Sequence, residues 1–232
     1  VTLVEKSKLG GTCLNVGCIP TKVLLHAADL LAEAESANDF GINVHVNGFD
    51  WKKVLKKKDS VSSQLVNGIK GLMKANKIKV INGTAEFVTS DTLAVTKADG
   101  TKEKLSGGKI IIATGSLPAI PPIQGIKEND NCIDSTGALS LSEVPKSLLV
   151  IGGGVIGVEF ASVYSQFGTK VTIIEALPKL LPLMEGELTE ILRNKLEKNG
   201  VGIYTEAKVQ SVEYSPLGAK VKVEYKGEVI SF

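Results

Sequence analysis

The apolar positions of the chain form short runs that are typical of strands and longer repeats that are typical of helices. The first run, residues 1–5, predicts a strand, and helices are predicted over about residues 13–37 and 49–76. Valine, leucine and alanine positions in the first helix predict that it is mostly buried. Residues 78–113 alternate in short runs broken by glycine-containing turns, which predicts strands that end with a buried strand over residues 110–113.

A second series of strands and helices begins near Pro145. The predicted elements are a strand over 148–151, a helix through Phe167, a strand over 171–175, a helix over about 186–199 and short strands over 201–232. Strands that alternate with helices are typical of α/β proteins. We therefore expect an α/β fold with two domains, over residues 1–144 and 145–232.

Composition and charge restrict the function classes. Apolar residues make up 43% of the 232 positions, which is enough for a sizeable core, and the formal net charge is only +2. No apolar run approaches the ~20 residues of a membrane span. Five lysines crowd the predicted second helix and could form a nucleic-acid patch or a solvated helix face: Lys52, Lys53, Lys56, Lys57 and Lys58. No aromatic stripe accompanies them, which favours the solvated face and no nucleic-acid partner.

Two cysteines near the start carry the most specific chemical signal. Cys13 and Cys18 stand five positions apart, which is a rise of roughly 7.5 Å on a straight helix. A disulfide needs Cα atoms within about 7 Å, so the pair requires an irregular turn. Asn15 and Gly17 tolerate unusual backbone angles, and Pro20 suits the first turn of a helix.

The cysteine pair could be an exchangeable redox disulfide, a structural disulfide or half of a metal site. A thiolate at a helix start is stabilised by the backbone N–H groups there, which favours exchange. The chain has only three cysteines, whereas disulfide-stabilised domains are usually small and cysteine-rich. Cys132 is alone, and neither His26 nor His45 has ligand spacing to it. The pattern therefore indicates a redox-active pair and no metal.

The second half contains a glycine fingerprint between a predicted strand and a predicted helix. Gly152, Gly154 and Gly157 fit G-x-G-x-x-G, in which the glycines serve a tight turn, the approach to a pyrophosphate and close helix packing. Glu175 ends the next strand, where a carboxylate accepts hydrogen bonds from an adenosine ribose and repels a 2′-phosphate. The pattern predicts NAD rather than NADP; the alternative is a glycine turn that serves packing alone.

The first strand repeats a segment of the second series. Val-Thr-Leu-Val-Glu over residues 1–5 closely matches Val-Thr-Ile-Ile-Glu over residues 171–175. By this repeat Glu5 would take the ribose position of a first dinucleotide unit, unless it is an ordinary carboxylate at a strand end. The matching glycine loop and first strand would then lie before Val1, so we expect that residue 1 is not the natural start.

The amino-acid sequences of both motifs resemble those of one enzyme family. The segments Cys-Leu-Asn-Val-Gly-Cys-Ile-Pro-Thr-Lys, residues 13–22, and Gly-Gly-Gly-Val-Ile-Gly-Val-Glu, residues 152–159, resemble the dihydrolipoamide dehydrogenases among the flavin-dependent pyridine nucleotide-disulfide oxidoreductases. The resemblance covers the whole chain. It implies two Rossmann-like dinucleotide-binding domains: a partial FAD-binding domain over residues 1–144 that lacks its first strand, and an incomplete NAD-binding domain over residues 145–232. It implies FAD and NAD as cofactors and oxidation of dihydrolipoamide on a lipoyl-bearing protein domain. It also implies the E3 component of a 2-oxo acid dehydrogenase or glycine cleavage complex, a homodimer, and a bacterial cytoplasm or mitochondrial matrix.

The resemblance also implies roles for individual residues. Cys13 would exchange with the dithiol substrate, and Cys18 would lie against the flavin. Lys22 would sit near the flavin and pair with Glu159, although both could be ordinary surface residues. The implied FAD contacts are Glu5, Gly11, Thr12, Lys22, Gly83, Thr114, Gly115 and Ser116. The implied NAD contacts are Gly152, Gly153, Gly154, Val155, Ile156, Gly157, Val158, Glu159, Glu175 and Val209. Val209 would line the adenine side of the pocket, or it is a core strand valine.

The chain departs from the family pattern at both ends. The first FAD phosphate loop, the rest of the NAD unit, the later FAD segment and the dimerisation domain with its His-Glu pair have no counterpart here, so we expect little activity from this stretch alone. A glutathione or mercuric reductase relative is the nearest alternative; such reductases commonly use NADPH and carry basic residues where Ala176, Leu177 and Pro178 follow Glu175. A non-catalytic binding subunit is a further alternative, but the presence of both cysteines is evidence against it.

Overall fold

The computed structural model describes residues 1–216 and 218–232, so Leu217, within the predicted last series of strands, lies outside the described residues. The chain divides into two compact units, each built from two stretches of sequence. The first unit contains Val1–Pro20 and Asp59–Leu117, and the second contains Thr21–Lys58 and Pro118–Phe232.

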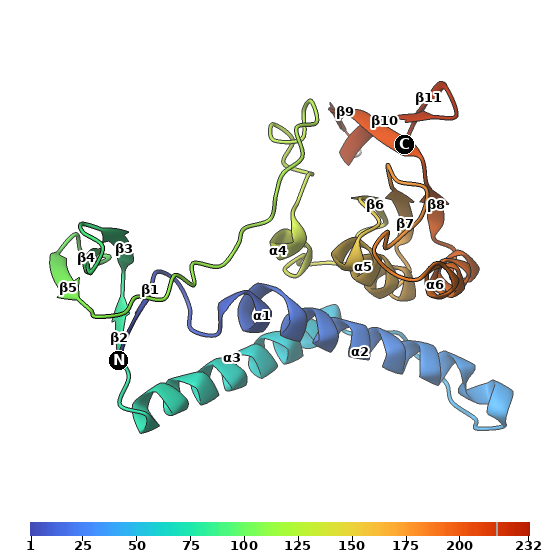
Figure 1. Ribbon diagram of the computed structural model, residues 1–232. Helices are drawn as coiled ribbons and strands as arrows, with labels where there is room; N and C mark the ends of the chain where they lie inside the picture. Colours follow the sequence, from blue (N-terminus) through green and yellow to red (C-terminus); the bar gives the residue numbers. More distant parts are fainter. Residues whose placement is uncertain (217) are drawn as a thin grey trace. The chain divides into compact units, whose positions relative to one another are not determined.

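Most of the described elements follow the predicted order (Figure 1), although the short helix α4 was not predicted and the strand expected over residues 110–113 is absent. The helices are α1 Gly11–Val16, α2 Cys18–Ser36, a 3₁₀ turn Ala37–Phe40, α3 Trp51–Ala75, α4 Ser135–Ala138, α5 Val155–Gln166 and α6 Gly186–Lys198. The strands are β1 Thr2–Glu5, β2 Lys79–Asn82, β3 Thr84–Phe87, β4 Thr92–Thr96, β5 Lys102–Ser106, β6 Ser147–Ile151, β7 Lys170–Ile174, β8 Gly202–Tyr204, β9 Ala207–Ser215, β10 Gly218–Tyr225 and β11 Glu228–Ser231. The mixed α/β class is thereby confirmed.

The first unit holds two small sheets. β1 pairs in parallel with β2, so that Leu3 lies beside Val80 and Glu5 beside Asn82. β3, β4 and β5 form an antiparallel meander, with Val95 of the central strand fully buried. The strands and turns predicted before residue 107 are therefore present.

The predicted buried strand over residues 110–113 is wrong. These residues belong to no strand, and the side chains of Ile111 and Ile112 are 90% and 70% exposed. An apolar run is buried as a strand only where neighbouring strands satisfy its backbone N–H and C=O groups. None of the strands described in this structure pairs with residues 110–113.

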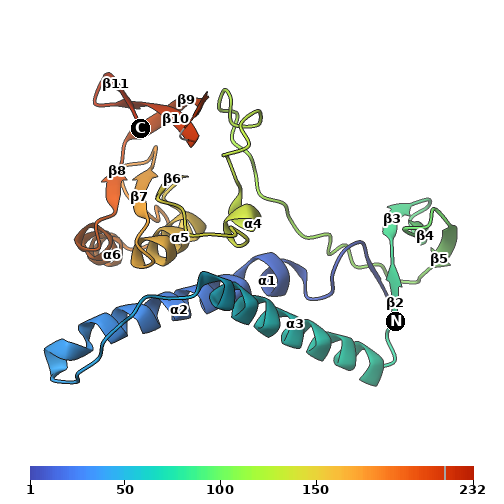
Figure 2. The ribbon, with the colours of Figure 1, turned by 180° about the vertical axis from the view of Figure 1, so that it is seen from behind.

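The second unit is built on a parallel sheet of order β6–β7–β8, with α5 connecting β6 to β7 and α6 preceding β8 (Figure 2). Helix α5 is rich in apolar residues all round, and it buries Val158, Phe160, Ala161, Val163 and Tyr164. A helix of this kind must be covered on several sides, which explains its place in the core.

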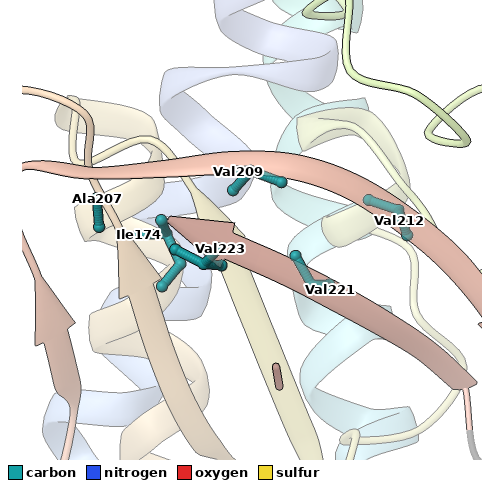
Figure 3. Packing of buried hydrophobic residues seen from close by; sticks show 6 residues of the cluster. All are labelled: Ile174, Ala207, Val209, Val212, Val221 and Val223. Carbon is teal, nitrogen blue, oxygen red and sulfur yellow. The ribbon is translucent and has the colours of Figure 1, made fainter. Parts of the chain in front are cut away.

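An antiparallel sheet, β9–β10–β11, covers one end of this core. Inward-facing side chains of β9 and β10 alternate with exposed ones, as expected for a sheet with one buried face. Figure 3 shows the resulting cluster, which joins the end of β7 to both strands: Ile174, Ala207, Val209, Val212, Val221 and Val223.

Two expectations about the helices need correction. Helix α2 is not mostly buried: it buries Leu24 and Ala28 but leaves the side chain of Leu30 53% exposed, because only one face meets other residues. The lysine run is not solvated throughout, since Lys58 is only 6% exposed and its Nζ donates to the backbone oxygen of Leu139 at 2.7 Å. Lys52, Lys53, Lys56 and Lys57 are exposed as predicted.

The turn after α4, which we define from the last helical residue Ala138 to Leu141, accepts hydrogen bonds from three side chains of the second unit. Besides Lys58, the indole N–H of Trp51 donates to the backbone oxygen of Leu141 at 2.8 Å, and the hydroxyl of Tyr164 donates to that of Ala138. The Trp51 and Tyr164 rings lie 5.9 Å apart between centroids. These contacts fix the first turns of α3 against the turn and against α5.

Candidate redox and dinucleotide sites

The cysteine pair lies at a one-residue break between two helices. Helix α1 ends at Val16, helix α2 begins at Cys18, and Gly17 between them has φ −137° and ψ −117°. The predicted irregular turn is thereby confirmed. A Cβ on Gly17 would lie 3.0 Å from the backbone oxygen of Thr12, so glycine allows a closer approach than other residues would.

Asn15 was expected to supply an unusual backbone conformation between the cysteines, and this expectation is wrong. Asn15 lies within α1 and has no left-handed backbone conformation. Its side-chain Nδ2 instead donates to the backbone oxygens of Leu9 at 3.0 Å and Gly11 at 2.9 Å. The residue therefore stabilises the turn that leads into α1, which fits the preference of asparagine for bonding to nearby backbone groups.

Cys13 and Cys18 are exposed free thiols in this structure. The hydrogen bond between the two thiols raises the pKa of Cys13, and partial burial and the charge of Cys18 act in the same direction. The backbone N–H groups of Cys18 and Ile19, at the start of α2, act in the opposite direction by hydrogen bonding to the Cys13 sulfur. The pair is therefore close enough for the two sulfurs to interact, as a redox pair requires.

Lys22 of α2 and Glu159 of α5 form an ion pair through Nζ and Oε1. Their side chains are 59% and 24% exposed, so the contact lies at the surface of the second unit. The pairing suggested by the resemblance is present, whereas proximity to a flavin remains a prediction. The alternative, in which Lys22 and Glu159 are unrelated surface residues, is therefore wrong.

The glycine loop after β6 has the geometry that its fingerprint predicts. Gly152 has φ 105°, a left-handed value that suits the tight turn. A Cβ on Gly157 would lie 2.2 Å from the backbone oxygen of Gly152 and 3.0 Å from Val150, which shows close packing of α5 on β6. A Cβ on Gly154 would meet nothing within 4 Å, so the backbone at the start of α5 is open to a ligand.

Sequence reasoning missed the backbone contacts that surround Gly153. Its N–H donates to Oε2 of Glu175 at 2.6 Å, and its oxygen accepts from the N–H of Leu181 at 2.9 Å. Oε1 of Glu175 accepts from the N–H of Leu177 at 2.7 Å, and Glu175 is only 8% exposed. Leu181 has φ 48°, an uncommon conformation for leucine, and nothing in the residue type signals it.

The residues suggested for FAD are only partly brought together. Gly83 donates its N–H to the backbone oxygen of Glu5 at 3.0 Å, and a Cβ on Gly83 would lie 2.7 Å from the backbone oxygen of Thr96. A cavity of about 390 Å³ opens beside them, lined in part by Lys6 and Lys97. Oε1 of Glu5 accepts from the N–H of Ser7 at 2.8 Å.

The other suggested FAD residues lie outside regular strands. Gly11 and Thr12 are exposed in the first turn of α1. Thr114, Gly115 and Ser116 are exposed in irregular chain, so the expected strand end at this position is wrong for the reason given for residues 110–113.

The remaining candidates have structural surroundings. Val209 is 8% exposed within the core cluster, which fits its core alternative, and its contact with an adenine stays a prediction. Cys132 packs beside the same cluster, and burial raises the pKa of its thiol. His26 and His45 are exposed. Among the described residues, no group of three or more His, Cys, Asp or Glu could hold a metal ion, and no helix is long and apolar enough to cross a membrane.

Comparison with known proteins decides the family. A family described as pyridine nucleotide-disulphide oxidoreductase matches residues 1–231. The chain belongs to this family. The resemblance of the two motifs to the family is thereby confirmed. Membership implies that a flavin and a pyridine nucleotide serve as cofactors, and the open start of α5 after Gly152 fits the nucleotide.

Curated members of the family match nearly all of the chain. Dihydrolipoyl dehydrogenase of Geobacillus stearothermophilus is 42% identical over 228 residues, covering 98% of this chain and 48% of that protein. The enzyme of the same name from Acholeplasma laidlawii is 40% identical over 233 residues, covering 97% of this chain and 68% of that protein. The chain thus spans about half the length of most of the curated relatives it matches.

A solved structure of the family has the same fold. The Cu(II) complex of the HOCl-induced flavoprotein disulfide reductase RclA from Escherichia coli superposes with a TM-score of 0.82 at 35% identity. The superposition covers 100% of this chain and 48% of the RclA chain. The Rossmann-like architecture implied by the resemblance is supported by this similarity.

Proposed function

We propose that this chain is the redox-disulfide and nucleotide-binding part of a dihydrolipoyl dehydrogenase. The observation that carries the proposal is the Cys13–Cys18 pair across the break at Gly17, at the point where α1 ends and α2 begins. Proteins named dihydrolipoyl dehydrogenase that are 40–42% identical to this chain support the choice of substrate.

The cysteines would carry out thiol–disulfide exchange in their oxidised form. A thiolate of dihydrolipoamide attacks Cys13, the bond between Cys13 and Cys18 breaks, and Cys18 leaves as a thiolate. The second substrate thiolate then attacks the mixed disulfide and releases Cys13, so lipoamide leaves as a disulfide and the cysteine pair is reduced by two electrons. The N–H groups at the start of α2 stabilise negative charge on Cys13 as it leaves.

The cofactors would supply the rest of the chemistry. FAD, when bound, exchanges an electron pair between the cysteine dithiol and NAD⁺. Residues 152–158 and Glu175 would hold NAD, with Val209 on its adenine side. Glu5, Gly11, Thr12, Gly83 and residues 114–116 would contact FAD, and Lys22, held by Glu159, would place a cation beside the flavin.

The proposal extends to organisation and partners. FAD-binding and NAD-binding domains would divide near residue 144. The lipoyl-bearing domain of a 2-oxo acid dehydrogenase or glycine cleavage complex would be the substrate. The whole protein would be a homodimer in a bacterial cytoplasm or a mitochondrial matrix.

An absorbance experiment tests the proposed function. We expect the purified full-length protein to show a flavin spectrum that gains a long-wavelength band on anaerobic addition of dihydrolipoamide. Cys18→Ser should bind flavin yet lose that band, and Cys132→Ser should keep it. A full-length protein that binds flavin but shows no spectral change with dihydrolipoamide would contradict the proposal.

A second candidate is a reductase for another disulfide. It is favoured by the solved flavoprotein disulfide reductase that covers 100% of this chain at 35% identity. Steady-state rates with NADH and NADPH separate the two, because Glu175 would repel the 2′-phosphate of NADPH. A strong preference for NADPH would support the second candidate.

A further inference from the structure

The segment that follows β7 holds the glycine loop at Gly153. Both backbone polar groups of Gly153 are bonded to this segment, the N–H to Glu175 and the oxygen to the N–H of Leu181. A Cβ on Gly153 would lie 2.4 Å from the side chain of Leu180, so the segment also packs closely against the loop. The position of Gly153 is therefore set by residues 175–181.

The carboxylate of Glu175 is the central group in this contact. It is 8% exposed, and each of its oxygens accepts one backbone N–H, from Gly153 at 2.6 Å and from Leu177 at 2.7 Å. Charge-assisted hydrogen bonds of this length are about twice as strong as neutral ones. Both donors are backbone N–H groups of the chain itself, so neither bond involves a ribose hydroxyl.

We infer that Glu175 is a positioning residue that holds the glycine loop in its phosphate-binding shape before a nucleotide binds. The inference rests on the proposed NAD site and adds to it. The N–H groups of Val155, Ile156 and Gly157 open α5, where no preceding helical turn offers them an acceptor, and are the natural anion ligands of the site. A loop that is already fixed spares the nucleotide the entropic cost of ordering it.

This role is separable from hydrogen bonding to a ribose. Each carboxylate oxygen has two lone pairs, so Glu175 can hold both N–H groups and still accept from a hydroxyl. Glutamine has one acceptor oxygen and one donor NH₂ group. In Glu175→Gln, one backbone N–H can still donate to the oxygen, but the other N–H faces the NH₂ group and loses its hydrogen bond.

The test measures binding of NAD⁺ and of its analogue that lacks the adenosine 2′-hydroxyl, by calorimetry on the full-length flavin-loaded protein. We expect Glu175→Gln to raise both dissociation constants by a similar factor, about tenfold. Amide hydrogen exchange at Gly153 and Leu177 should also become faster in the nucleotide-free variant. Glu190→Gln, on the exposed side of α6, is the matched control and should change none of these values.

Two results would overturn the inference. One is a Glu175→Gln protein that binds the 2′-deoxy analogue as tightly as wild type, since the carboxylate would then act through the hydroxyl alone. The other, which is informative even if the variant does not fold, is exchange of the Gly153 amide in the wild type at the rate of an unprotected loop. Slow exchange at Gly153 together with no binding of NAD⁺ by the wild type would instead refute the proposed nucleotide site and leave the loop contact standing.

Discussion

At the scale of single residues, the cysteine pair is shaped by the few groups at the break between α1 and α2. Gly17 allows the chain to pass close to Thr12, and Asn15 bonds the turn before α1. The break gives Cys13 two opposing influences, the Cys18 thiol and the N–H groups that open α2. The reactivity of Cys13 therefore depends on whether its thiol partner is present.

Replacement of Cys18 should change the pKa of the Cys13 thiol. In the reduced protein, Cys18→Ala removes the hydrogen bond that raises the pKa of Cys13 and leaves the N–H groups that lower it. We expect the pKa of Cys13 to fall and its alkylation by iodoacetamide near pH 7 to become faster. The rate is measured against pH, with Cys132→Ala in both proteins so that Cys13 is compared without the third thiol. A midpoint that stays fixed or rises would contradict the assignment.

At the scale of elements, two glycines at the start of α5 have different surroundings: one is packed against the chain and the other is open. Gly157 lies where a Cβ would collide with the backbone of Gly152, whereas Gly154 faces open space. The same helix carries Tyr164, which contacts the turn after α4, and Glu159, which pairs with Lys22. Helix α5 thus joins the glycine loop to the start of α2.

The two glycine positions should respond differently to alanine. Gly157→Ala should lower the free energy of unfolding by at least about 1–3 kcal/mol, because α5 must move away from β6. Gly154→Ala should leave stability nearly unchanged and weaken NAD⁺ binding, because its methyl group fills the space that a pyrophosphate needs. Urea unfolding and calorimetric titration measure both. Equal stability losses in the two variants would show that the described packing is incorrect.

The buried lysine of α3 gives a second test at this scale. Lys58→Met keeps the apolar stem but leaves the oxygen of Leu139 without its donor, and we expect a loss of about 1–3 kcal/mol in the free energy of unfolding. Lys57→Met, one position earlier and exposed, is the control and should change stability by less than about 0.5 kcal/mol. Denaturant unfolding gives both values, and similar effects in the two variants would argue against burial of Lys58.

At the scale of the whole molecule, each compact unit combines sequence stretches that are far apart. The second unit joins residues 21–58 to residues 118–232, and Trp51, Lys58 and Tyr164 are the side chains that bond both stretches to the turn after α4. Tyr164 is fully buried in this contact, and burial raises its pKa from 10.0 to about 12. The stability of the protein at alkaline pH should therefore depend on this tyrosine.

The pH dependence has a definite sign. The phenol of Tyr164 ionises at a lower pH in the unfolded chain than in the folded protein, so its contribution to stability is full below pH 10 and is lost as the pH rises through about 12. Tyr164→Phe is less stable at neutral pH but should lose less stability between pH 10 and 12. Tyr214→Phe, at a position that is 79% exposed, should follow the wild-type slope. Equal slopes for all three proteins in urea unfolding would contradict the prediction.

Much of the fold was predictable because local patterns and tertiary contacts agree. The spacing of apolar residues predicted α3, α5 and α6 to within a few residues, and the glycine fingerprint predicted the turn at Gly152 and the packing at Gly157. Residues 110–113 were predicted incorrectly because their apolar run resembles a buried strand, whereas pairing depends on neighbours that the run itself does not specify. The bonds of Lys58 and of Gly153 were also missed, since each partner is far away in the sequence or is a backbone group without a side-chain signature.

The sequence by itself determined the chemistry of this protein: two cysteines at a helix start and a glycine loop between a strand and a helix. These features are local, because a turn or a helix start depends on residues that follow one another along the chain. The tertiary structure alone decided which distant groups meet, such as Lys22 with Glu159 and Tyr164 with the turn after α4. It also decided that both oxygens of Glu175 hold backbone N–H groups, because burial and approach in space set which donors a carboxylate can reach.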